Sequence, residues 1–389
     1  MLQTLLLFTG LWRATLALPD AELPFNFEIK NVQNKIVIEI INGEERIVVD
    51  EVTTKDDSIF FKMPVFDSEV KAYTINGLMR GVYINHARKT NPEIPFEARY
   101  GETNRFIAKY PASKPANFNG RWAVNFSEGT ADSSYAVGIF NQKGNYLSGT
   151  FLTETGDYRY LEGLVDRDSL FLSCFDGSHA FLFKAELSNG KIKGMYYSGN
   201  HWKEPWIAMR DEKAELPDAY SITYMKPGYD KFDFRFPDLD SNMVSFSDKR
   251  FKGKVTVIQI MGSWCPNCLD ETIFLAPFYE KHKDKKFQII GLAFEKTNDF
   301  KKSVSNVKRL SARYNVQYPI LIAGTSNKED AAKALPMLNK ITGYPTTIII
   351  DKKGNVRRIH TGFTGPATGK YYDRFVEEFT LMIEKLERE

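Results

Sequence analysis

The sequence predicts an α+β multidomain protein, in which an all-β N-terminal region (barrel or sandwich) precedes a C-terminal α/β domain. Up to about residue 210, short alternating apolar runs are cut by Gly, Asn, Asp and Pro, which is typical of antiparallel sheet. After Asp211, strand-like and helix-like runs alternate, which is typical of an α/β domain. The length of 389 residues also corresponds to two or three domains of about 150 residues.

The composition narrows the possible partners. Lys and Arg total 52 against 49 Asp and Glu, a net charge of +3, so there is no electrostatic reason to expect nucleic acid or an anionic membrane. Aromatic residues make up 14% of the chain, which favours β-structure. No apolar stretch approaches 18 residues, so no transmembrane helix is expected.

The N-terminus has an apolar run at residues 5–8 with no basic residue before it. We interpret residues 1–9 as the remnant of a secretory signal, and the alternative is an ordinary first strand. Nine residues are too few for a complete signal, and the residues at 16–18 form a poor cleavage site.

Four runs in this region are clear predicted strands, at residues 35–41, 58–62, 135–140 and 169–174. The region also repeats itself. GLW at residues 10–12 returns as GRW at 120–122, and GVY at 81–83 returns as GMY at 194–196. Further pairs follow in the same order at a near-constant offset, which predicts a duplicated region with β-rich repeats at residues 10–103 and 119–212. We expect the two repeats to form either tandem barrels or sandwiches, or the two halves of a single barrel or sandwich.

No catalytic constellation is evident in the repeats. His86, His179 and His201 are isolated, and Cys174 fits a buried strand thiol. The aromatic run Trp202–Trp206 fits core and hairpin packing better than a binding face.

A linker is predicted at residues 213–233, followed by the α/β domain at 234–389. The predicted strands are residues 255–261, 287–294, 319–323, 346–351 and 356–360, and the predicted helices are 268–283, 299–314, 329–338 and 370–386.

The chemistry of the chain lies between the first of these strands and its helix, in the run Trp264-Cys265-Pro266-Asn267-Cys268. The N–H groups at a helix N-terminus stabilise the thiolate of a cysteine placed there. We therefore expect Cys265 to attack a substrate disulfide and Cys268, one turn along, to resolve the mixed disulfide. Pro266 restrains the turn between them.

Two other uses of the pair fit less well. A zinc site needs four ligands, and the chain has no second cysteine pair. A purely structural disulfide at this spacing closes too small a loop to stabilise much. The pattern therefore indicates a redox-active disulfide between Cys265 and Cys268, with no metal and no cofactor.

Several motifs support a resemblance over roughly the last 150 residues: FPDLD at 236–240, FKGKV at 251–255, GSWCPNC at 262–268 with Glu271, and GYPTT at 343–347. In combination they resemble the thioredoxin superfamily, and specifically the TlpA-like thiol-disulfide oxidoreductases of bacterial cell envelopes. The duplicated β region is outside this resemblance.

The resemblance implies roles for further residues. Pro345 matches the cis-proline beside the cysteine pair, and Tyr344 would present its backbone to an extended substrate chain. Trp264, Pro266 and Asn267 would also border the substrate. Glu295 matches an acidic residue near the cysteines that tunes the thiols or shuttles a proton; the alternative is an exposed glutamate at a strand end.

The chain departs from the family at two positions. Gln259 stands where thioredoxin has a buried aspartate, which leaves Glu295 as the acid candidate. Ile273 stands where many relatives have a helix-kinking proline, so we expect a straighter first helix.

Together these features predict a secreted thiol-disulfide oxidoreductase of the periplasm or cell envelope. Its expected partners are a protein disulfide as substrate and a membrane thiol reductase as electron donor, with a reductive direction implied by the resemblance. The alternatives are a peptide- or partner-binding module and a thiol peroxidase.

Overall fold

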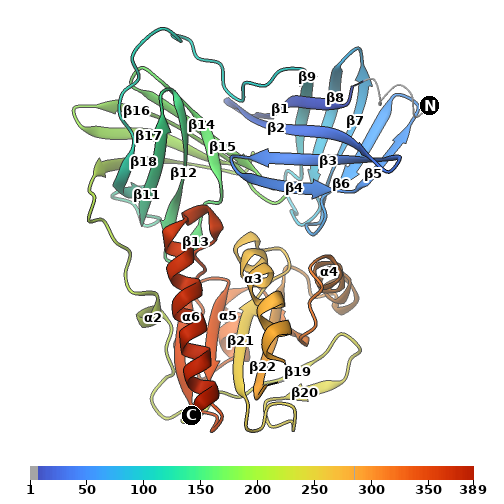
Figure 1. Cartoon of the computed structure of the whole chain (residues 1–389), viewed down its shortest axis with the longest axis vertical. Coiled ribbons are helices and arrows are strands. Elements are labelled where there is room, and N and C mark those ends of the chain that lie inside the picture. The colour runs from blue at the N-terminus through green and yellow to red at the C-terminus, as the bar shows by residue number, and fades with distance from the viewer. Residues whose placement is uncertain (1–7, 284) are drawn as a thin grey trace. The chain divides into compact units, whose positions relative to one another are not determined.

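A computed structural model describes residues 8–283 and 285–389 of the chain (Figure 1). The chain forms two units. Unit 1 contains the described residues of Met1–Phe151 together with Tyr158–Glu215, and unit 2 contains Leu152–Asp157 together with Leu216–Glu389. The predicted signal remnant lies almost entirely outside the described residues. In the described ranges, none of the helices has the length and apolar character that a membrane crossing requires.

The first sheet of unit 1 has nine strands in the order β4-β3-β2-β1-β9-β8-β7-β6-β5. Its neighbouring strands all run antiparallel. The strands are β1 (Gly10–Leu18), β2 (Ala21–Val32), β3 (Lys35–Asn42), β4 (Glu45–Val49), β5 (Glu51–Lys55), β6 (Ser58–Lys62), β7 (Ser68–Ile75), β8 (Leu78–Asn85) and β9 (Glu93–Tyr100).

The second sheet also has nine strands, in the order β11-β10-β18-β17-β16-β15-β14-β12-β13, and an additional pairing of β11 with β12 closes it into a barrel. Its buried interior is rich in aromatic rings, among them Phe126, Phe151, Phe183 and Trp206. The strands are β10 (Gly120–Phe126), β11 (Ser134–Lys143), β12 (Tyr146–Thr153), β13 (Gly156–Asp157), β14 (Leu161–Asp166), β15 (Ser169–Phe175), β16 (Ala180–Ser188), β17 (Lys191–Ser198) and β18 (Trp202–Arg210).

Alternation of side chains explains why these segments form strands. In β1, Trp12, Ala14 and Leu16 are buried while the residues between them are more exposed. Tight hairpins occur where the backbone has positive φ, as at Asn76-Gly77 between β7 and β8. All four predicted strands are confirmed, within β3, β6, β11 and β15. The N-terminal region is thus all-β with barrel-like sheets.

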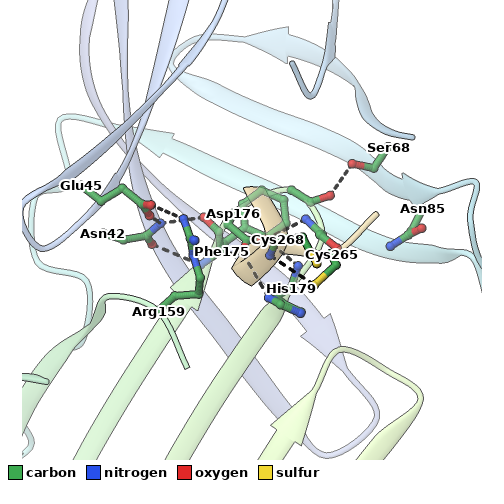
Figure 2. Close-up of polar contacts among 12 residues, drawn as sticks. Asn42, Glu45, Ser68, Asn85, Arg159, Phe175, Asp176, His179, Cys265 and Cys268 are labelled. Atoms are coloured by element: carbon green, nitrogen blue, oxygen red, sulfur yellow. Dashed lines mark hydrogen bonds and ion pairs between the residues drawn. The ribbon is translucent and has the colours of Figure 1, made fainter. Parts of the chain in front are cut away.

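A buried polar network joins the two sheets within unit 1. Figure 2 shows the Arg159 guanidinium between Glu45 of β4 and Asp176, which follows β15, and it forms an ion pair with each. Asn42 donates to the Phe175 carbonyl at 2.9 Å and accepts from the Phe175 N–H at 3.1 Å. Arg159 and Asp176 are almost fully buried. Removal of one partner would therefore leave a buried charge uncompensated.

Unit 2 contains a five-stranded sheet in the order β23-β22-β21-β24-β25. The central strand β21 pairs parallel with β22 and antiparallel with β24. Every residue of β21 and β22 is buried, which fits their continuous apolar sequences. The strands are β21 (Val255–Met261), β22 (Phe287–Glu295), β23 (Ile320–Thr325), β24 (Thr346–Ile350) and β25 (Val356–Thr361), with the separate hairpin β19 (Arg235–Pro237) and β20 (Met243–Ser245).

The described helices of the chain all belong to unit 2. They are α2 (Ala219–Ile222), α3 (Pro266–His282), α4 (Phe300–Arg313), α5 (Lys328–Ala334), α6 (Lys370–Arg388) and the short 3₁₀ helix η1 (Pro366–Thr368). Strands and helices follow one another along this unit from β21 to α6.

One predicted helix boundary was wrong, and two other segments contain features that the sequence pattern did not predict. Helix α5 ends at Ala334 rather than at residue 338, because Pro336 cannot continue the helical hydrogen bonding. The predicted linker contains the one-turn helix α2, which Asp218 caps by accepting from the Tyr220 N–H. Helix α3 contains Pro277, which cannot donate a hydrogen bond to the Ile273 carbonyl, so the absence of a proline at 273 does not leave the helix free of proline.

Candidate active site

The cysteine pair lies where the buried strand β21 gives way to helix α3. Cys265 is the N-cap residue of α3, and Pro266 occupies the first helical position, where its missing N–H is not needed. The Sγ atom of Cys265 accepts a hydrogen bond from the backbone N–H of Cys268 at 3.4 Å (Figure 2). The predicted position of the first cysteine at a helix N-terminus is therefore confirmed.

The two cysteines differ in exposure. Cys265 is 7% exposed, whereas Cys268 is fully buried. Burial raises the pKa of the Cys268 thiol well above its ordinary value, and its interaction with Cys265 and the negative charge of Glu271 act in the same direction. Both cysteines are free thiols in this structure.

The loop before β24 lies directly against Cys265. The Tyr344–Pro345 peptide bond is cis, as the family resemblance implies. The thiol of Cys265 donates to the carbonyl oxygen of Tyr344 at 3.4 Å. The structure therefore brings Cys265, Cys268, Tyr344 and Pro345 together, although they come from two separate parts of the sequence.

Trp264 borders the same place. Its ring lies edge-on to the ring of Tyr344, with 5.6 Å between centroids, and its Nε1–H donates to the Phe294 carbonyl at 2.9 Å. The ammonium of Lys296, an exposed residue, lies 4.4 Å from the centre of the Trp264 ring. Trp264 is partly exposed, so a molecule that approaches Cys265 can contact it.

Asn267, between the cysteines, is half-buried. Within the described part of the chain, its Oδ1 atom is inaccessible to solvent and accepts no hydrogen bond.

Glu295, at the end of β22, fixes the loop that carries the cysteines. Its carboxylate accepts from the backbone N–H of Ser263 at 2.8 Å and from the Ser263 hydroxyl at 2.7 Å. The residue is 1% exposed, so it is not an exposed strand-end glutamate. Burial raises the pKa of this carboxyl, and the hydrogen bonds from Ser263 lower it in part. Among the described residues, no hydrogen bond joins Glu295 to either cysteine.

A second buried carboxyl, Glu271, was not assigned a role from the sequence. It lies on α3 one turn after Cys268, and its Oε1 accepts from the Thr347 hydroxyl of β24. Its Oε2 atom is buried and has no hydrogen-bond partner among the described residues. Burial raises the pKa of Glu271 to about 7. The i, i+3 spacing from Cys268 would have placed it on the cysteine face of the helix.

Gln259 holds α3 onto the sheet. Its side-chain amide donates to the Cys268 carbonyl at 3.3 Å and to the Thr272 hydroxyl at 3.2 Å. Its carbonyl oxygen accepts from the hydroxyl of Tyr318 at 3.3 Å. A glutamine here thus connects three buried groups without carrying a charge.

The cysteine, histidine and aromatic residues of the β region to which no catalytic role was assigned have structural roles. Cys174 is fully buried, and burial raises the pKa of its thiol. His179 is hydrogen-bonded to Asp176 of the polar network. Of the aromatic run, Trp206 is in the core, as predicted, whereas Trp202 is 46% exposed.

Comparison with known proteins bears on unit 2. Residues 207–373 match the family model described as Redoxin. The thiol-disulfide oxidoreductase ResA of Bacillus thuringiensis subsp. konkukian is 27% identical over 132 residues, which are 34% of this chain and 68% of that protein. ResA of Halalkalibacterium halodurans is 25% identical over 158 residues, which are 41% of this chain and 77% of that protein.

The C-terminal region is a thioredoxin-like domain, and it is similar to the thiol-disulfide oxidoreductases named above. A solved thiol:disulfide interchange protein of the thioredoxin family from Chlorobium tepidum is 23% identical, covers 40% of this chain and 98% of that one, and has a TM-score of 0.30. The match to the Redoxin model begins at residue 207, near the end of the β region. The part of this oxidoreductase that matches known proteins is therefore the part that carries the cysteine pair.

Proposed function

We propose that this oxidoreductase reduces protein disulfides through a Cys265/Cys268 dithiol. One observation carries the proposal: the sulfur of Cys265 caps helix α3, receives the Cys268 N–H and lies against the carbonyl of Tyr344 before the cis-proline. An N–H directed at sulfur favours negative charge on that atom when it acts as a nucleophile. The backbone beside Pro345 offers hydrogen-bonding groups to an extended substrate.

The reaction proceeds in two exchanges. The Cys265 thiolate attacks one sulfur of the substrate disulfide, so a Cys265–substrate bond forms, the substrate S–S bond breaks, and the released thiolate takes up a proton. Cys268 then loses its proton and attacks the Cys265 sulfur, which releases the second substrate thiol. The enzyme ends as a Cys265–Cys268 disulfide, having given two electrons and two protons to the substrate.

Two carboxyl groups support the proton transfers. Cys268 must lose a proton although burial holds its pKa high. Glu271, one turn along the same helix and with a pKa of about 7, is suited to accept that proton near neutral pH. Glu295 holds the loop of Cys265 through Ser263, and we assign it the role of tuning the nucleophile through that loop.

Trp264, Pro266, Tyr344 and Pro345 form the substrate-binding surface in this proposal. Asn267 was also expected there, but its side-chain amide lies against Gly156. We propose that the protein acts in the periplasm or cell envelope, because its sequence motifs resemble those of the TlpA-like enzymes of that compartment. A membrane thiol reductase, which supplies two electrons and two protons as a dithiol, would return the enzyme to its reduced form.

The duplicated origin of unit 1 is part of the same proposal. Trp12 pairs with Tyr100 and Trp122 pairs with Arg210, a separation of 88 residues in each case. The indole N–H of each tryptophan donates to the backbone carbonyl four residues earlier. Matching registers in the two sheets support two copies of one ancestral β unit.

Reduction of insulin by the pre-reduced chain tests the function. Wild type should reduce insulin, Cys265→Ser should be inactive, and Cys268→Ser should accumulate a mixed disulfide with the substrate. Cys174→Ser is the matched control, because Cys174 is also buried but lies in unit 1. Unchanged activity in Cys265→Ser would refute the proposed mechanism, and hydrogen peroxide consumption without insulin reduction would favour a thiol peroxidase.

A further inference from the structure

A short hairpin that precedes the rest of unit 2 by more than fifty residues lies against the candidate active site. Leu152–Asp157 belongs to unit 2, although the chain on both sides of it belongs to unit 1. The hairpin is closed by pairing of Leu152 with Asp157 and of Thr153 with Gly156. Its turn is held by the Thr153 hydroxyl, which donates to the Gly156 carbonyl at 2.9 Å.

The hairpin contacts each of the three loops around Cys265. At the cysteine loop, a β-carbon on Gly156 would lie 1.9 Å from Nδ2 of Asn267. At the cis-proline loop, a β-carbon on Gly343 would lie 2.4 Å from Cγ2 of Thr155. At the loop after β25, a β-carbon on Gly362 would lie 2.7 Å from the Glu154 carbonyl oxygen.

A buried hydrogen bond anchors the hairpin. Oδ2 of Asp157 accepts from the backbone N–H of Gly365 at 2.7 Å, and Asp157 is 6% exposed. Glycines at 156, 343 and 362 allow backbone and side chains to approach more closely than a β-carbon would permit. The close fit and the buried anchor together indicate a built contact.

We propose that the Leu152–Asp157 hairpin selects the substrates of this oxidoreductase, a role that rests on the proposed function. It fills the side of the cysteine pair bordered by Asn267, Gly343 and Gly362. A disulfide therefore reaches Cys265 from the side of Trp264. This arrangement favours disulfides in small molecules and in narrow, flexible peptide segments over disulfides on the broad surface of a folded protein.

The test compares two substrates, oxidised glutathione and folded insulin, by kcat/KM. Gly156→Ala removes the close approach to Asn267, and Asp157→Ala removes the bond to Gly365. Both variants should raise the ratio of insulin to glutathione activity by about tenfold, because a weakened contact opens the second side of the site. Asp132→Ala, which changes an exposed aspartate in a loop of unit 1, should leave the ratio unchanged.

A second readout does not depend on turnover. The rate at which a bulky maleimide–polyethylene glycol modifies Cys265, relative to iodoacetamide, should rise in both hairpin variants. If Gly156→Ala loses its helical circular dichroism, it is unfolded, and the test of the hairpin then depends on Asp157→Ala alone. Unchanged ratios in a folded variant would overturn the selection role while leaving the oxidoreductase proposal intact. A wild-type chain that reduces neither substrate would overturn both.

Discussion

Replacement of Glu271 by glutamine should change how the stability of unit 2 depends on pH. Burial raises the pKa of this carboxyl from 4.5 to about 7 in the folded protein. The folded chain therefore holds the proton more tightly than the unfolded chain does. The stability due to this proton is fully present below about pH 4.5 and is lost as the pH rises through about 7.

The size of the effect follows from the same values. At about 1.4 kcal/mol for each pH unit, the difference between 4.5 and about 7 corresponds to about 3 kcal/mol. Wild type should lose about this much free energy of unfolding between about pH 4 and pH 8 through Glu271 alone. Glu271→Gln cannot ionise, so its stability relative to wild type should rise by about 3 kcal/mol over that range.

Urea unfolding followed by helical circular dichroism measures this difference. The described helices all lie in unit 2, so the helical signal reports that unit. Glu377→Gln, the same change at an exposed position of α6, is the matched control and should follow the wild-type pH dependence. If Glu271→Gln and wild type change in parallel with pH, Glu271 does not retain its proton in the folded state, and its role as the base for Cys268 fails.

Three further predictions address other parts of the molecule. Arg159→Met should destabilise unit 1 by about 3–5 kcal/mol, because Asp176 would lose its buried cationic partner. Urea unfolding followed by tryptophan fluorescence measures this change. A decrease in the free energy of unfolding of less than about 1 kcal/mol would contradict the prediction. Glu295→Gln should shift the pH dependence of Cys265 alkylation, whereas an unshifted profile would reduce Glu295 to a purely structural contact with Ser263. Gly81→Ala and Gly194→Ala should each lower the free energy of unfolding by about 1–3 kcal/mol, because the new β-carbons would lie 1.9 and 2.2 Å from the carbonyl oxygens of Lys71 and Lys184. If only one of the two changes destabilised the protein, this would count against the duplication.

Local patterns in the sequence were sufficient for much of the fold. Alternating side chains gave the strands of the β region, because each sheet buries one face. The continuous apolar run at 255–261 gave the central strand β21, and the cysteine motif after it gave the start of α3. The cis bond before Pro345 followed from the family resemblance, since nothing in the local sequence requires it.

The remaining features depend on contacts between distant residues. Glu271 is an ordinary helix residue in the sequence, and its raised pKa arises from its burial in the folded domain, which the sequence alone does not show. Leu152–Asp157 reads as a turn between strands, and no local signal shows that Asp157 accepts a hydrogen bond from Gly365. Pro336 and Pro277 are plain in the sequence. The periodic pattern of apolar residues nevertheless predicted neither the early end of α5 before Pro336 nor the position of Pro277 inside α3.

Mass spectrometry of a single turnover tests the central claim most directly. The pre-reduced chain is mixed with a model disulfide, quenched with an alkylating agent and digested, and the peptide that carries residues 265–268 is weighed. The account predicts that this peptide loses two hydrogen atoms and becomes resistant to alkylation as the substrate is reduced, while Cys174 remains a thiol. Substrate reduction without a disulfide between Cys265 and Cys268 would contradict it.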